Sequence, residues 1–223
     1  HPSANPENPL DAGQYRWITE DIYVEHARGP HGGNLAGHLV RNSYFGLTAG
    51  PLLGNPYPAL FENCVFEWQA GDRGQDAFTV HIRRNRKPKP AAGGMRDCIV
   101  RVLPYKQPTA IVSAPAGLPD PYAWRLKNNT WIVDPEAKTS WWRGADTPEK
   151  TSPDFVTAFD GSKNLTERFY GSLADWTTPL GEANSFEQWN TWHGGGSSQE
   201  KALDLPEGFM RDGAAIREKV GRD

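Results

Sequence analysis

The chain lacks the features that mark membrane proteins and nucleic-acid-binding proteins. Its 223 residues contain no apolar run near the roughly 18 residues that a membrane-spanning helix needs, which predicts a soluble protein. The formal net charge of −3 provides no basic surface for nucleic acid. Only residues 83–89 form a basic run, and a solvated loop is the expected structure there. We therefore expect neither a membrane span nor a nucleic-acid partner.

Catalytic and cofactor signatures are also missing. The sequence has no phosphate-binding loop, dinucleotide fingerprint, nucleophile elbow or paired-cysteine zinc motif. The histidines at positions 26, 31 and 38 are spaced more widely than the ligand pairs of most zinc sites. The function must therefore be inferred from the fold and from less specific groups of residues.

A helical pattern is absent before residue 145, whereas turn-forming residues are abundant. The chain contains 23 Gly and 19 Pro, and 37% of its residues are hydrophobic. Short strand-like stretches, such as 77–82 and 109–113, alternate with Gly/Pro loops. This pattern predicts a single all-β domain.

One six-residue motif occurs four times without internal gaps. It consists of an apolar residue, a charged residue, Asn or Asp, a small residue, any residue, and an apolar or aromatic residue. The copies are residues 40–45, 61–66, 95–100 and 126–131. Stacked repeats place like residues on one another, which predicts Asn ladders at the turns and one interior column. That column, called the apolar column below, would contain Phe45, Phe66, Val100 and Trp131.

The motif resembles that of a known architecture. Arg41-Asn42-Ser43-Tyr44-Phe45, Glu62-Asn63-Cys64-Val65-Phe66 and Lys127-Asn128-Asn129-Thr130-Trp131 are similar to the coil motif of right-handed parallel β-helix proteins. Pectate-lyase-like polysaccharide lyases, polygalacturonase-like hydrolases and phage tailspikes share this architecture. The resemblance covers residues 23–133, and residues 185–200 are similar to the segment that closes many bacterial β-helix chains. The expected fold is a right-handed parallel β-helix with an irregular, partly helical C-terminal cap, and the alternative is a β-sandwich.

The expected organisation has three parts. Residues 1–20 form an N-terminal arm, residues 21–145 form the coils, and residues 146–223 form the C-terminal cap. Helical turns are expected at 172–176 and at 185–192, with Ser185 as an N-cap. The chain opens His1-Pro2-Ser3 with neither an initiator Met nor a signal-peptide pattern, which fits a mature secreted product or a shortened chain.

Cys64 and Cys98 occupy the same position of the motif. If the repeats stack, both side chains point into the interior. Buried free thiols are the favoured state because free cysteine is among the most buried residue types. One disulfide remains the alternative.

The resemblance implies an extracellular protein that acts on an acidic polysaccharide, as a lyase or a glycoside hydrolase. A lyase needs a base to remove the proton beside a uronate carboxylate, and cations or calcium to neutralise that carboxylate. In the lyases this base is typically Lys or Arg. The catalytic candidates are Arg83, Arg101, His81 and Lys127. The substrate-binding candidates are Arg41, Arg84, Glu67, Trp141 and Trp142.

Further residues extend this site. Arg96 is a cation on an outward face, and Glu62, Glu67 and Asp97 are candidate calcium ligands or, in a hydrolase, the acid pair. A row of alternating cations and carboxylates would suit an acidic sugar. Apart from calcium, no cofactor is expected for this function.

Two alternatives stay open. The first is a non-catalytic carbohydrate-binding or attachment module, or a fragment of a larger β-helix enzyme. The second is a copper-dependent lytic polysaccharide monooxygenase on a β-sandwich, because such enzymes begin with a histidine whose amine and ring bind copper. His1 would be one ligand and His81 the natural second one, with His26, His31, His38 or His193 as alternatives.

Overall fold

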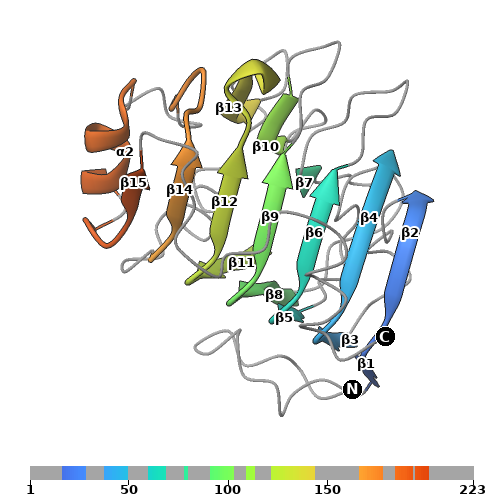
Figure 1. The fold of residues 1–223 in the computed structure, drawn as a ribbon. Coiled ribbons are helices and arrows are strands. Elements are labelled where there is room, and N and C mark those ends of the chain that lie inside the picture. The colour runs from blue at the N-terminus through green and yellow to red at the C-terminus, as the bar shows by residue number, and fades with distance from the viewer. Residues whose placement is uncertain are drawn as a thin grey trace, which may run out of the picture.

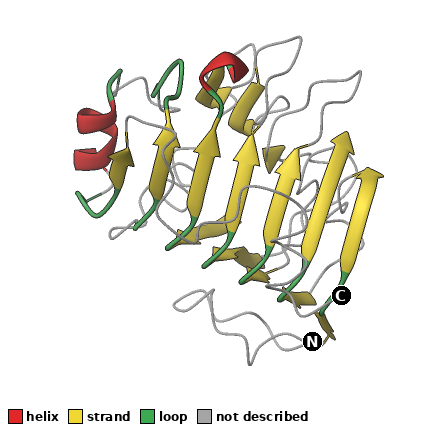
Figure 2. Ribbon diagram, viewed as in Figure 1, coloured by secondary structure: helices red, strands yellow, loops and turns green. Residues whose placement is uncertain are grey.

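The structure is a computed structural model, and β-strands dominate its described residues. These residues are 17–28, 38–49, 60–68, 78–79, 91–102, 109–113, 122–143, 166–177, 184–192 and 194–200. Their strands form three sheets in which all pairings are parallel (Figures 1 and 2). The predicted all-β class is thereby confirmed as a β-rich, parallel structure. Among the described residues, no helix combines the length and apolar character that crossing a membrane requires.

The largest sheet has seven strands in the order β15-β14-β12-β9-β6-β4-β2. These strands are β2 (Tyr23–Arg28), β4 (Tyr44–Ala49), β6 (Val65–Trp68), β9 (Ile99–Val102), β12 (Thr130–Val133), β14 (Arg168–Gly171) and β15 (Ser198–Glu200). Spatial order follows chain order, so the chain adds one strand to this sheet at each return (Figure 1).

The second sheet has five strands in the order β1-β3-β5-β8-β11, and the third has three strands in the order β13-β10-β7. The second contains β1 (Trp17–Glu20), β3 (His38–Arg41), β5 (Leu60–Glu62), β8 (Ala91–Arg96) and β11 (Tyr122–Lys127). The third contains β7 (Phe78–Thr79), β10 (Thr109–Ser113) and β13 (Thr139–Arg143). Each strand of the five-stranded sheet is joined by a two-residue turn to a strand of the seven-stranded sheet.

Strand register aligns the four copies of the motif. Phe45 pairs with Phe66, Phe66 with Val100, and Val100 with Trp131. The Phe45 and Phe66 rings are stacked, with centroids 5.3 Å apart and planes 10° apart. The predicted apolar column is therefore confirmed. It also continues to Phe169, which pairs with Trp131.

The turns explain the Asn or Asp of the motif. Five turn residues have a left-handed backbone conformation, with φ between 50° and 55°: Asp21, Asn42, Asn63, Asp97 and Asn128. Asn and Asp adopt this conformation more readily than other residues with a Cβ atom. The Asn63 amide donates from Nδ2 to Asn42 Oδ1 at 2.9 Å, which confirms the predicted Asn ladder for this pair.

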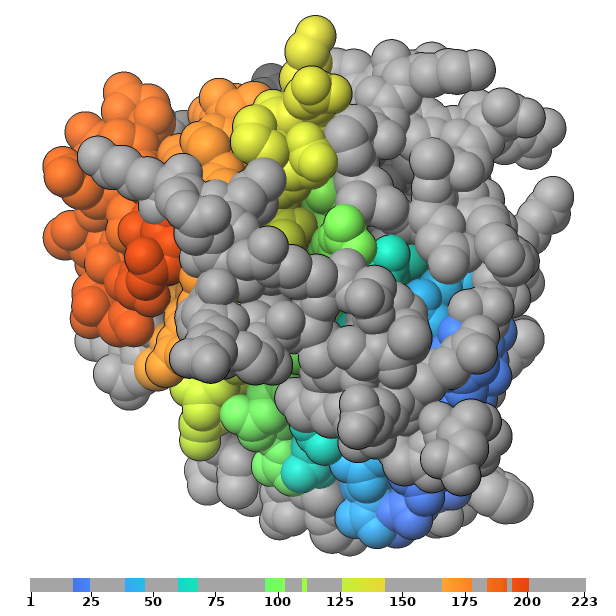
Figure 3. All heavy atoms as spheres, viewed as in Figure 1, coloured from blue at the N-terminus to red at the C-terminus, as the bar shows by residue number. Residues whose placement is uncertain are grey.

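The sheets extend beyond the predicted coil region, residues 21–145, at both of its ends. Strand β1 pairs with β3, although residues 17–20 were expected in the arm. Strands β14 and β15 extend the seven-stranded sheet beyond residue 145. The early and late parts of the described chain lie at opposite ends of the molecule (Figure 3).

Helix α2 (Phe186–Trp192) confirms one of the two helical predictions. Ser185 Oγ accepts a hydrogen bond from Gln188 N at 3.3 Å, as expected of an N-cap. The other prediction, at 172–176, is wrong. Ala174 N donates to Thr139 O and Asp175 forms a parallel bridge with Ser140, so this segment pairs with β13 instead of forming a helix.

Candidate functional site

A row of charged residues follows the end of the five-stranded sheet. Each strand there ends in an ionisable side chain, in the order Glu20, Arg41, Glu62, Arg96, Lys127. The strand register pairs each of these residues with the next. Neighbouring strands lie about 4.8 Å apart, so the charges follow one another at that spacing. We call these five residues the charged row.

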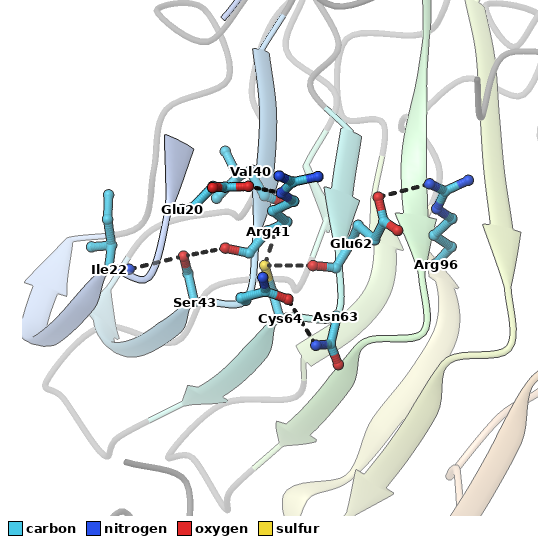
Figure 4. Close-up of polar contacts among 10 residues, drawn as sticks. Glu20, Ile22, Val40, Arg41, Ser43, Glu62, Asn63, Cys64 and Arg96 are labelled. Atoms are coloured by element: carbon cyan, nitrogen blue, oxygen red, sulfur yellow. Dashed lines mark hydrogen bonds and ion pairs between the residues drawn. The ribbon is translucent and has the colours of Figure 1, made fainter. Parts of the chain in front are cut away.

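Ion pairs join successive members of the charged row (Figure 4). Arg41 Nε forms a salt bridge with Glu20 Oε1, and Arg96 Nη2 lies 2.7 Å from Glu62 Oε2. The exposed fractions of the side chains are 41% and 36% in the first pair, and 26% and 27% in the second. Water and solutes therefore reach the row.

Two cations stand side by side at one end of the row. Lys127 is exposed and is paired in register with Arg96. Within the described part of the chain, no carboxylate lies within ion-pair distance of Lys127. This end of the charged row is therefore its positive end.

A second polar row lies beside the first. It consists of the five turn residues with positive φ, Asp21, Asn42, Asn63, Asp97 and Asn128, and we call it the turn row. All are exposed except Asn42, which is half-buried. Amide and carboxylate groups donate and accept hydrogen bonds, so the two rows together offer charges and neutral polar groups along one edge.

Another ion pair lies on the outward face of the seven-stranded sheet. Glu67 on β6 and Arg101 on β9 are paired in register, with Arg101 Nη1 3.2 Å from Glu67 Oε1. Glu67 is largely covered, since 12% of its side chain is exposed, against 34% for Arg101. Tyr44 and Val65 on the same face are buried, so this part of the face is less open than the charged row.

The predicted catalytic residues do not form one cluster. Lys127 belongs to the charged row, whereas Arg101 is bound to Glu67 on the outward face of the seven-stranded sheet. Arginine side chains keep their charge in proteins, which suits Arg101 to holding an anion better than to removing a proton. His81 and Arg83 lie outside the described residues.

Of the predicted substrate-binding residues, Arg41 lies in the charged row and Glu67 pairs with Arg101. Arg84 lies outside the described residues. The prediction for Trp141 is wrong, because this side chain has no exposed surface. Its ring packs edge-on against Trp189, with centroids 4.8 Å apart. Trp142 points to the opposite side of β13, is half-buried, and packs against the core.

The predicted metal ligands are not gathered into a site. The described residues contain no group of three or more His, Cys, Asp or Glu side chains that could hold a metal ion. Glu62 and Glu67, proposed for calcium, bind different arginines. His1 and His81, proposed for copper, lie outside the described residues.

Glu167 is a buried carboxylate that the sequence motif did not predict. In four repeats the residue after the turn residue is buried, and Glu167 takes the same place in the next repeat. These residues form the polar column: Ser43, Cys64, Cys98, Asn129 and Glu167. Glu167 accepts hydrogen bonds from Trp131 Nε1 at 2.7 Å and from Asn129 N and Nδ2, each at 3.3 Å. Burial raises the pKa of Glu167 to about 7, although these hydrogen bonds lower it. In this repeat only Phe169, two residues further on, matches the motif, at its last apolar position.

Cys64 and Cys98 are buried free thiols, as favoured from the sequence.

Comparison of the chain with protein-family models, with curated proteins and with solved structures finds no match in any of the three.

Proposed function

We propose that this chain is a right-handed parallel β-helix that binds an acidic polysaccharide outside the cell, as a non-catalytic attachment module. The charged row and the turn row form its binding edge. The observation that carries the proposal is the exposed charged row, which ends in two adjacent cations, Arg96 and Lys127.

The order of the strands supports the β-helix. The chain visits the five-stranded, seven-stranded and three-stranded sheets in the same sequence three times, as β5-β6-β7, β8-β9-β10 and β11-β12-β13. Each circuit stacks like residues on like, which is the arrangement of a solenoid. Parallel strands in one sheet are connected with right-handed crossovers in almost all proteins, which supports the right-handed form.

The spacing and chemistry of the edge support a linear anionic ligand. Arginine and lysine bind the carboxylates of uronate sugars, and arginine does so with two parallel hydrogen bonds. Asn63 and Asn128 in the turn row offer amide groups suited to sugar hydroxyls. A stretched polysaccharide presents its groups along a line, as the two rows do.

The ion pairs favour binding over catalysis. A lyase base must lose its proton, yet Arg41, Arg96 and Arg101 are each held in an ion pair with a carboxylate. A hydrolase needs two carboxyl groups that face the same bond. Glu62 and Glu67 are each bound to an arginine instead.

Binding to a panel of glycans tests the proposal. We expect the chain to bind at least one uronate polymer and no neutral polymer. Lys127→Glu should weaken the binding about tenfold or more, the equivalent of about 1.4 kcal/mol, because it replaces the attractive end of the row with a repulsive one. The matched control is Lys138→Glu, since Lys138 is exposed but follows the short helix Pro135–Ala137, away from the charged row.

Two results would contradict the proposal. Equal loss of affinity in both variants would mean that the charged row is not the binding site. If the chain bound no uronate polymer, an acidic polysaccharide would not be its ligand. The same panel, followed by ultraviolet absorbance, distinguishes the lyase. If unsaturated products appeared, the chain would be an enzyme rather than an attachment module.

A further inference from the structure

Cys64 and Cys98 are consecutive members of the polar column. Val65 N donates to Ser43 O at 2.8 Å, Ile99 N donates to Cys64 O at 2.9 Å, and Thr130 N donates to Cys98 O at 2.8 Å. These bonds place the two cysteines on neighbouring strands, with no residue of the column between them. Their Cα atoms are therefore separated by about one strand spacing, or roughly 4.8 Å.

The two thiols also have the same orientation. Cys64 Sγ lies 3.3 Å from Glu62 O in its own repeat and 3.5 Å from Val40 O in the preceding one. Cys98 Sγ lies 3.3 Å from Arg96 O and 3.5 Å from Phe61 O in the same way. The Cys98 thiol thus points toward the repeat that holds Cys64, and a hydrogen bond joins the two thiols.

We propose that Cys64 and Cys98 form a disulfide between consecutive repeats when the chain folds in the presence of a disulfide oxidant. The Cα separation falls within the range of about 4.4–6.8 Å that a disulfide accepts. The bond would close a loop that contains strands β6, β7 and β8. In the structure both residues are thiols, so the oxidised form is a second state of the same site.

The reaction is an ordinary thiol–disulfide exchange. The thiolate of one cysteine attacks oxidised glutathione, which forms a mixed disulfide and releases one reduced glutathione. The thiolate of the other cysteine attacks the protein sulfur of that mixed disulfide, which forms the Cys64–Cys98 bond and releases the second glutathione. Two cysteine thiols lose their protons and two electrons, and one molecule of oxidised glutathione is reduced to two thiols.

The bond should form during folding rather than in the finished fold. Both side chains are buried, with 1% of each exposed. Burial is the largest cause that raises the pKa of Cys98 well above its usual range, and the hydrogen bond with Cys64 adds to it. A buried thiol with little thiolate reacts slowly. In the folding chain the thiols are still exposed to the oxidant, so the mixed disulfide forms first, and stacking of the two repeats then brings the second thiol to it.

Refolding from urea in a glutathione redox buffer tests this inference. We expect the refolded protein to lose the mass of two hydrogens, to give a peptide that links Cys64 to Cys98, and to unfold at a higher urea concentration than the reduced protein. Protein that is already folded and reduced should stay reduced over the same period. Two alkylatable thiols after refolding would overturn the proposal, and equal oxidation of the folded protein would overturn the folding-stage mechanism.

The polar column supplies matched controls, because Ser43 occupies the neighbouring position on the other side of Cys64. The double variant Ser43→Cys with Cys98→Ser keeps two thiols on neighbouring strands and should form a disulfide. Ser43→Cys with Cys64→Ser places the thiols two strands apart, beyond the roughly 7 Å limit between Cα atoms, and should not. Equal oxidation of both double variants would show that stacking does not select the pair, and would overturn the proposal.

Discussion

The turn residues of the repeats have a backbone φ between 50° and 55°, a conformation that most residues with a Cβ atom avoid. Asn and Asp tolerate it because their short polar side chains form local hydrogen bonds. This constraint is visible in the sequence as the recurring Asn or Asp of the motif. It explains why the turn row could be predicted residue by residue at four of its five positions, and why Asp21, which follows no apolar-charged pair, was missed.

Glu167 is a buried carboxyl group whose pKa lies close to neutral pH. Its pKa of about 7 in the folded protein exceeds the ordinary value of 4.5, because burial disfavours the charged form. The nearby charge of Asp97 raises it further, whereas hydrogen bonds from Trp131 and Asn129 lower it. Between the two pKa values the unfolded chain has lost this proton while the folded chain keeps it. The stabilising contribution is therefore complete below about 4.5 and is lost as pH rises through about 7.

We predict that this group removes about 3 kcal/mol from the free energy of unfolding as pH rises from about 4 to about 8. Glu167→Gln should abolish this part of the pH dependence, since glutamine keeps the acceptor oxygen for Trp131 and does not titrate. Urea unfolding of both proteins at several pH values measures the difference. Glu187→Gln, at an exposed position of α2, is the control and should leave the wild-type slope. An unchanged slope in Glu167→Gln would contradict the assignment.

The sequence could not have identified Glu167 or placed the Trp141 ring. A carboxylate rarely occupies an interior position, so Thr-Glu-Arg-Phe at 166–169 departs from the motif where the motif demands a small residue. Trp141 and Trp142 are neighbours on one strand, where one side chain must face inward and the other outward. The sequence does not show which of the two side chains faces inward. In the structure it is Trp141 that is buried in the core.

At the scale of the element, α2 is too short to be stable on its own. It has seven residues, and isolated helices shorter than about 12 residues are marginal in water. The N-cap Ser185 could be predicted because capping is local in sequence. The segment at 172–176 looked equally helical, but its backbone bonds to β13 are long-range contacts that no local pattern reports.

Packing of the Trp189 side chain stabilises α2, which is too short to be stable on its own. This ring is fully buried, and its centroid lies 4.8 Å from that of Trp141, 5.1 Å from Trp176 and 5.5 Å from Phe169. Trp189→Ala should therefore lower the free energy of unfolding by about 3 to 5 kcal/mol and should release α2 from the end of the sheet. Urea unfolding and hydrogen exchange of residues 186–192 measure the two effects.

The control for this prediction is Glu187→Ala, two residues before Trp189 and on the exposed side of the same helix. It should change stability by no more than about 0.5 kcal/mol. If Trp189→Ala left the exchange of α2 unaltered, the helix would be held by contacts other than the aromatic cluster.

At the scale of the whole molecule, the stacking of repeats was the part of the fold that the sequence predicted best. The register of the apolar column follows from four gapless motifs. The extent of the stack was harder to predict, since β14 and β15 carry no full motif and join the sheet through long-range pairing. The charged row was implied by the second position of the motif, but the pairing of its charges depends on register.

Stacked repeats predict a graded stability along the molecule, because each strand contacts only its neighbours. In the seven-stranded sheet, the five inner strands have a partner on both sides, and β6, β9 and β12 lie farthest from the end strands β2 and β15. Amide hydrogen exchange should therefore be slowest in the three central strands and fastest in the two end strands. Phe66→Ala, which cuts the apolar column in β6, should accelerate exchange in both β4 and β9, its two partners in the sheet. Phe186→Ala, at the α2 end, should leave β4 unchanged, and uniform acceleration throughout the sheet by both variants would mean that the repeats unfold as one unit.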